Sequence, residues 1–218
     1  MKETLLFIGI IVILVLVGFL VYQNIIKIEE KISFKKMAMS EKTLENKKIA
    51  MIIAFKDFRD EEYFVPKEIL EAAGAEIKTI STQLGSVVGA DGGEAKVDLL
   101  ISDINISDFD AIVFIGGPGT LKYLDDENSY QVARETISQN KVLAAICISP
   151  VILAKAGVLN GKRATVWSSI MDKSAIKILE EKGATYQDED VVVDGKIVTA
   201  SGPAVARKFG EAIVEQLQ

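Results

Sequence analysis

From residue 48 onward, short apolar runs alternate with longer segments of helical spacing. The apolar runs are rich in β-branched residues, and they predict buried strands at 48–55, 75–80, 111–115, 141–146, 164–167, 191–193 and 196–199. Helices are predicted at about 61–74, 120–140, 151–156, 169–182 and 204–217, and a hairpin rich in turn residues at 86–97. Strands that alternate with helices favour a parallel sheet covered on both faces. The expected fold is therefore α/β with a doubly wound sheet.

The first 26 residues contain the longest apolar run. Residues 5–22 include no charged side chain, and a helix of that length nearly crosses the hydrocarbon core of a bilayer. Apolar residues just beyond extend the run, so we predict a single transmembrane helix at 5–26 after a short tail at 1–4. A cleaved signal peptide is disfavoured, because no small-residue cleavage site follows the run. A buried core helix is the other alternative.

The segment after this run is charged and lacks proline and glycine. It predicts a helical or partly ordered stalk at 27–47, followed by a domain at 48–218. The side of the membrane span toward the domain is rich in lysine, with Lys27, Lys31, Lys35 and Lys36 close to it. The positive-inside rule then predicts a single-pass membrane protein, bound to lipid through residues 5–26, whose domain lies in the cytoplasm.

Composition excludes several kinds of site. The 218-residue chain has one cysteine, so it can form no internal disulfide and no thiolate metal cluster. It has no histidine, which removes the most common general base and the most common zinc ligand. A net charge of -6 without a basic cluster disfavours nucleic acid as a partner. No metal ion or cofactor is expected.

The single cysteine, Cys147, lies where a predicted strand meets a predicted helix. The strand ends at Ile146, and the pair Ser149-Pro150 suits the first turn of a helix. A sharp strand-to-helix turn raises the side chain above the carboxyl edge of the sheet and directs free helix N–H groups toward it. Such donors favour a thiolate, so we expect the pKa of Cys147 to be lowered. The alternative is a small, inert core residue.

Two other segments are expected at the same edge of the sheet, because ligands of such folds bind beyond the carboxyl ends of the strands. One is a polar turn at 56–60 with Glu61 and Glu62 directly after it, and the other is the glycine loop at 116–119. Either glutamate could instead serve only the dipole of its helix. The glycines could serve only a tight turn, and their spacing lacks the full pattern of a phosphate-binding loop.

Several motifs together resemble the ThiJ/PfpI family, part of the superfamily that includes the class I glutamine amidotransferases. The resemblance covers about residues 48–217. Its marks are the glutamate four positions before Pro66 and the stretches VVGADGGEAKVD, FDAIVFIGGPG, AAICISPVILAKAGVLNGKRAT and VTASGPAVARKFGEAIVEQL. The resemblance implies a flavodoxin-like fold with a nucleophile elbow, and it implies a homodimer.

The resemblance also implies roles for individual residues. Cys147 would be the reactive cysteine, and Glu62 the carboxyl group that hydrogen-bonds to it. Gly117 and the backbone N–H of Ile148 would form an oxyanion pocket, since such donors can hold developing negative charge. The rest of the pocket would consist of Gly116, Pro118, Ser149 and Trp167.

The chain departs from the family pattern at two positions. Ile148 stands where the protease-like branch has a histidine, and Trp167 stands where the branch with glyoxalase and deglycase activity has one. Peptide hydrolysis needs a proton for a poor amine leaving group, so these departures disfavour an intracellular cysteine protease of the PfpI type. Thiolate addition to an aldehyde, with one carboxyl group as proton shuttle, requires less.

The expected function is therefore that of a membrane-anchored, thiol-dependent hydrolase or lyase of the glyoxalase or deglycase kind. Its substrates would be small reactive carbonyl compounds or modified proteins. Two alternatives stay open. One is a non-catalytic redox sensor or interaction module, in which Cys147 oxidises to a sulfinic acid that Glu62 stabilises. The other is an inert family member retained for assembly.

Overall fold

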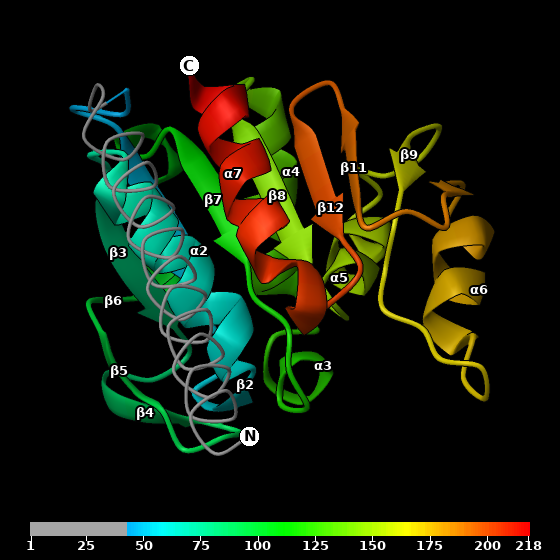
Figure 1. Ribbon diagram of the computed structural model, residues 1–218, viewed down its shortest axis with the longest axis horizontal. Coiled ribbons are helices and arrows are strands. Elements are labelled where there is room, and N and C mark those ends of the chain that lie inside the picture. The colour runs from blue at the N-terminus through cyan, green and yellow to red at the C-terminus, as the bar shows by residue number, and fades with distance from the viewer. Residues whose placement is uncertain (1–42) are drawn as a thin grey trace, which may run out of the picture. The chain divides into compact units, whose positions relative to one another are not determined.

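Figure 1 shows the computed structural model, which describes residues 43–218 of the chain. These residues include the whole of the predicted α/β domain. The transmembrane helix predicted at 5–26 lies outside them, as does most of the predicted stalk. Between residues 43 and 218, no helix is both long and apolar enough to span a bilayer.

A seven-stranded sheet forms the centre of the domain, in the order β11-β12-β8-β7-β1-β3-β6. Its strands are β1 (Lys48–Ile52), β3 (Glu76–Ser81), β6 (Leu99–Leu100), β7 (Ala111–Phe114), β8 (Val142–Ile146), β11 (Val191–Asp194) and β12 (Ile197–Ala200). Every neighbouring pair is parallel except β11 with β12. The prediction of a parallel sheet is confirmed for six of the strands, and it is wrong for the edge strand β11, which is antiparallel.

Helices cover both faces of this sheet (Figure 1). One face carries α2 (Asp60–Ala72) and α7 (Ala206–Leu217), and the other carries α4 (Glu127–Ser138) and α5 (Pro150–Lys155). Helix α6 (Ser174–Glu181) packs beside α5 and belongs to the same apolar cluster. Along β1, Ile49 and Met51 pack on the side of α2 and α7, whereas Ala50 and Ile52 pack on the opposite side. This period of two, with both faces buried, explains why the strand is apolar throughout. Shorter described elements are α3 (Thr120–Tyr123), η1 (Ile101–Asp103), η2 (Ile106–Asp108) and η3 (Pro203–Val205).

A three-stranded sheet lies beside the start of α2. It consists of β2 (Lys56–Phe58), β4 (Gly85–Gly89) and β5 (Glu94–Val97). Strands β4 and β5 are antiparallel, which confirms the predicted hairpin. Strand β2 replaces part of the polar turn predicted at 56–60, because it pairs with β4, a partner distant in the sequence.

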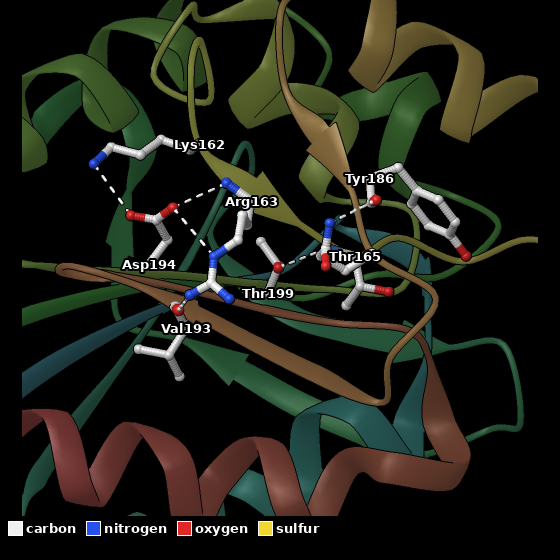
Figure 2. Close-up of polar contacts among 8 residues, drawn as sticks. Lys162, Arg163, Thr165, Tyr186, Val193, Asp194 and Thr199 are labelled. Carbon is white, nitrogen blue, oxygen red and sulfur yellow. Dashed lines mark hydrogen bonds and ion pairs between the residues drawn. The ribbon is translucent and has the colours of Figure 1, made fainter.

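A small two-stranded sheet follows α5. It consists of β9 (Arg163–Ala164) and β10 (Thr185–Tyr186). Figure 2 shows how it is tied to the hairpin of β11 and β12. Asp194 accepts a hydrogen bond from Arg163 N at 2.9 Å and pairs with Lys162 at 3.2 Å, while Thr165 N donates to Thr199 Oγ1 at 2.9 Å. These bonds fix the path of the chain as it leaves β9.

The helix predicted at 169–182 is shorter than expected, because it begins only at Ser174. Before it, Ser169 Oγ accepts hydrogen bonds from the N–H groups of Met171 and Asp172 at 3.3 and 3.0 Å. Serine side chains compete with a helix in this way, by offering the backbone a local turn. The strand predicted at 164–167 is also shorter, since β9 has two residues.

The residues just before β1 pack on the domain. Leu44 is fully buried, and its N–H donates to Ala73 O, at the end of α2, with a distance of 2.9 Å. Lys47 N donates to Leu44 O and closes a turn. The last part of the predicted stalk, residues 43–47, therefore lies against α2.

Phe209 offers a test of the packing of α7. Its side chain is fully buried, so we expect Phe209→Ala to lower the free energy of unfolding by about 3–5 kcal/mol, through lost burial and the cavity left behind. Its neighbour Lys208 is exposed and forms a surface ion pair with Asp190, so Lys208→Ala should leave that free energy nearly unchanged. Urea denaturation measures both. Equal losses in the two variants would contradict this packing.

Candidate active site

Cys147 occupies the turn between β8 and α5, where its backbone is strained. Its φ is +63°, in the left-handed region that residues with a Cβ rarely adopt. Two hydrogen bonds hold the turn: Cys147 N donates to Ala200 O at 2.9 Å, and Trp167 N donates to Cys147 O at 2.8 Å. Segments distant in the sequence therefore impose the conformation of a nucleophile elbow.

Ser149, predicted to line the pocket, braces this elbow. Its side chain is fully buried, and its Oγ donates to Ile115 O at 2.8 Å. Ile115 directly follows β7, at the start of the glycine loop. The hydroxyl group is thus engaged in joining the elbow to that loop.

Gly116 allows three segments to meet beside the sulfur. A Cβ on Gly116 would lie 2.5 Å from Glu62 Oε2 and 2.6 Å from Cys147 Cβ, so only glycine fits between them. On the other side, Gly116 O accepts a hydrogen bond from Arg59 N at 2.9 Å. The loop therefore brings the start of α2 into contact with the elbow.

The next glycines pack against the segment that precedes α2. Gly117 has a φ of +129°, and a Cβ there would overlap the backbone N of Arg59. Gly119 N donates to Asp57 O at 3.0 Å, and a Cβ on Gly119 would overlap the backbone of β2. Pro118, between them, is exposed. The glycines of the predicted loop thus allow its backbone to pack closely against the backbone of the segment before α2.

Glu62 lies in the first turn of α2 with its side chain completely buried, whereas Glu61 is exposed. Neither carboxyl oxygen has a hydrogen-bond partner of good geometry among the described residues. The Cys147 thiol and the Gly116 N–H nevertheless lie close to the carboxyl group. Burial raises the pKa of Glu62 to about 7, and the thiol, the Arg59 guanidinium and that N–H each limit the rise. Glu62 therefore exchanges its proton near neutral pH.

The Cys147 thiol has a raised pKa, which corrects the expectation that the helix N-terminus lowers it. Burial contributes most, and the Glu62 carboxylate raises the pKa further, because a thiolate would place two negative charges side by side. The N–H groups of Ile148 and Gly117 act in the opposite direction but do not prevail. The two groups consequently titrate as a pair, in which protonation of Glu62 favours the thiolate.

Ile148 and Trp167 supply no side chain that titrates near neutral pH. Ile148 is half-buried and faces the sulfur through its backbone N–H. Trp167 is 36% exposed, and its Cδ1 lies 3.4 Å from where a Cβ on Gly202 would be. The side chains next to the elbow at these two positions are therefore largely apolar.

Arg59 belongs to the site, although no sequence pattern singled it out. It directly precedes α2, and its Nη1 pairs with Asp91 at 3.0 Å. Its guanidinium acts electrostatically on both Glu62 and Cys147. The one signal in the sequence is a cation three positions before Glu62, which is too common near helix ends to identify a site.

The arrangement combines a nucleophile, a carboxyl group that titrates near neutrality and two backbone donors. Such a set can add sulfur to an electrophilic carbon, hold the negative charge that develops and move a proton. Between residues 43 and 218, no group of three or more cysteine, aspartate or glutamate side chains is placed to hold a metal ion.

Comparison with known proteins gives the relatives of the chain. A model of the DJ-1/PfpI family matches residues 47–216. An uncharacterized protein of Methanocaldococcus jannaschii is 42% identical over 176 residues, which cover 80% of this chain and 84% of that protein. A deglycase of Pyrococcus horikoshii is 33% identical over 154 residues, which cover 71% of this chain and 90% of the relative.

The structure agrees with these matches. The crystal structure of a ThiJ/PfpI domain protein from Brachyspira murdochii has a TM-score of 0.75 and 34% sequence identity to this chain. The match covers 79% of this chain and 97% of that one. The resemblance indicated by the sequence motifs is thus confirmed over nearly all of the described residues: the chain belongs to the DJ-1/PfpI family.

Proposed function

We propose that this protein is a thiol-dependent hydrolase or lyase for small reactive carbonyl compounds or their adducts on proteins. The observation that carries the proposal is the position of Cys147 beside a buried Glu62 whose pKa is about 7. A carboxyl group with that pKa can take and return a proton at physiological pH. The Pyrococcus horikoshii relative is named a deglycase, which supports chemistry of this kind.

In the first step, the Glu62 carboxylate takes the thiol proton as the sulfur attacks an aldehyde carbon. A C–S bond forms, the π electron pair of the C=O group moves onto oxygen, and the N–H groups of Gly117 and Ile148 stabilise the charge. Glu62 then returns its proton to that oxygen, which yields a hemithioacetal. A raised thiol pKa suits this sequence, because the proton leaves only during the attack.

With a 2-oxoaldehyde, the same carboxylate can complete an isomerisation. Glu62 removes the proton from the carbon bonded to sulfur, and the proton returns to the neighbouring carbon through an enediol, so that a thioester of a 2-hydroxy acid forms. Water then cleaves the C–S bond, with Glu62 as general base, and releases the acid and the thiol. One carbon is oxidised and its neighbour reduced, so no external oxidant is needed.

Peptide hydrolysis is less well matched to this site. An amine leaving group needs a proton donor at its nitrogen, and the side chains of Ile148 and Trp167 supply none that titrates near neutrality. Glu62 would have to serve the sulfur, the nitrogen and the attacking water in turn, from a completely buried position. An aldehyde makes no such demand, since no bond to a poor leaving group breaks.

A redox sensor is also less well supported. Peroxide oxidises the thiolate form of cysteine, and both burial and the Glu62 carboxylate keep Cys147 protonated. The raised thiol pKa therefore favours a nucleophile that loses its proton only as it reacts.

Two further features stay predictions. Membrane attachment through residues 5–26 is supported by the absence of charge at 5–22. A homodimer is supported by the family resemblance. Neither is needed for the chemistry proposed for Cys147.

Turnover of methylglyoxal tests the proposal. We expect the protein to release lactate, with kcat/KM rising through about pH 7, because Glu62 must be ionised to accept the thiol proton. Cys147→Ser should abolish turnover, and Glu62→Gln should lower kcat by about 10²–10⁴-fold. A lactate assay gives the rates.

Glu61→Gln is the matched control, since Glu61 is the exposed neighbour of Glu62 and should be dispensable. Absence of lactate with the native protein, or unchanged turnover in Cys147→Ser, would contradict the proposed function.

Alkylation of Cys147 tests the pairing of the two groups without any substrate. Because the carboxylate raises the thiol pKa, Glu62→Gln should move the pH profile of iodoacetamide alkylation to lower pH. The chain has one cysteine, so mass spectrometry of the whole protein follows the reaction directly. A profile that stays in place, or moves to higher pH, would show that Glu62 does not act on the sulfur.

The buried carboxyl group should also cost stability. Its pKa is raised from the ordinary 4.5 to about 7, so the folded state binds this proton more tightly than the unfolded state. As the pH rises from about 4.5 to 7, ionisation of Glu62 should therefore lower the free energy of unfolding by on the order of 3 kcal/mol. We expect Glu62→Gln to be more stable than the native protein at about pH 8 but not at about pH 4.5. Urea denaturation at both pH values measures the difference in stability between the two proteins. The same difference at both pH values would contradict a raised pKa of Glu62 in the folded state.

A further inference from the structure

Arg59 lies beside the Cys147–Glu62 pair and also reaches solvent. Its backbone N–H donates to Gly116 O at 2.9 Å, and Gly116 is the residue on which Glu62 and Cys147 converge. Its side chain is 33% exposed. The guanidinium also lies near enough to act electrostatically on Glu62 and Cys147, so a molecule whose carbonyl carbon lies at the sulfur could reach it with another of its groups.

The charge of Arg59 acts on the reacting groups. Its guanidinium lowers the pKa of Glu62 against the effect of burial. Arginine keeps its charge throughout the physiological pH range, and its planar fork of N–H donors matches the two oxygens of a carboxylate. Arg59 thus has the chemistry to bind an anionic group next to the nucleophile.

The present partner of Arg59 is an exposed carboxylate. Nη1 alone contacts Asp91, with distances of 3.0 and 3.3 Å to its two carboxyl oxygens, so the contact does not use two nitrogens of the fork. The Asp91 side chain is 58% exposed, on the turn between β4 and β5. Exposed ion pairs of this kind contribute little and can be exchanged for another anion.

The turn that carries Asp91 is held independently of this ion pair. Asp91 N donates to Asp60 Oδ2 at 2.8 Å, and Gly93 N donates to the other oxygen of the same carboxylate. A ligand could therefore displace the side chain of Asp91 while the turn stays in place.

We propose that Arg59 is a substrate-recognition residue that selects carbonyl compounds carrying a carboxylate. The substrate carboxylate replaces Asp91 on the guanidinium while the carbonyl carbon lies at the Cys147 sulfur. The substrate class rests on the proposed function, but the recognition of a carboxylate beside the sulfur does not require turnover.

Two alkylating reagents of nearly equal size test this recognition. Iodoacetate carries a carboxylate and iodoacetamide does not; both form an S–C bond with the Cys147 thiolate and release iodide. The ratio of their rate constants cancels any change in the thiolate fraction, because both react with the same thiolate. In the full chain at low salt, we expect Arg59→Gln to lower the iodoacetate-to-iodoacetamide ratio by about fivefold.

Three variants give matched comparisons. Arg59→Lys keeps the charge but loses the planar fork, so its ratio should lie between those of the native protein and Arg59→Gln. Asp91→Asn removes the competing carboxylate and should raise the ratio above the native value. Lys196→Gln removes an exposed cation before β12, at the amino ends of the parallel strands and so away from Cys147. This variant should leave the ratio unchanged.

The outcomes separate this proposal from the proposed function. An equal ratio in the native protein and Arg59→Gln would overturn the role of Arg59, whether or not methylglyoxal is converted to lactate. A parallel fall of both rate constants would overturn it as well, because Arg59 would then act only on the thiolate fraction. A lower ratio without any turnover of methylglyoxal would support carboxylate recognition and overturn the proposed function alone.

Discussion

The site depends on one constraint: residue 116 must be a glycine, which has no Cβ. Glu62 and Cys147 both occupy the space that a Cβ would fill, so any larger residue would separate the carboxyl group from the sulfur. Their contact is costly, since it combines a non-glycine residue at φ +63° with a buried carboxyl group. The two apolar clusters on either side of the sheet stabilise the fold enough to hold this arrangement.

Local patterns were sufficient for the framework of the fold. The boundary between β8 and α5 follows from an apolar run that ends at Ile146 and a proline that suits a helix start at Pro150, so Cys147 could be placed at the elbow. Strand β2 and the early end of β9 could not be predicted, because pairing with distant strands determines them. The same holds for the hydroxyl of Ser149, whose acceptor is contributed by Ile115.

The sign of the thiol pKa shift shows where sequence reasoning about the site failed. A helix start after Cys147 predicts donors toward the sulfur, and the N–H groups of Ile148 and Gly117 do lower the pKa. The sequence does not reveal how deeply the sulfur is buried or that Glu62, from a helix far away in the chain, touches it. Those two effects outweigh the donors. The role of Arg59 could not be predicted for the same reason, since it depends on contacts with residues that are distant in the sequence.

Burial is what lets a glutamate act in a chain without histidine. A glutamate exposed to water, with a pKa near its ordinary 4.5, would be a weak base at neutral pH and would take the thiol proton poorly. Removal of Glu62 from water raises its pKa to about 7, near the ordinary value for an imidazole. The same desolvation makes the ionised group destabilising in the folded state, so stability and proton transfer at this position oppose one another. A variant that relieves the cost by admitting water to Glu62 should therefore lose the proton shuttle with it.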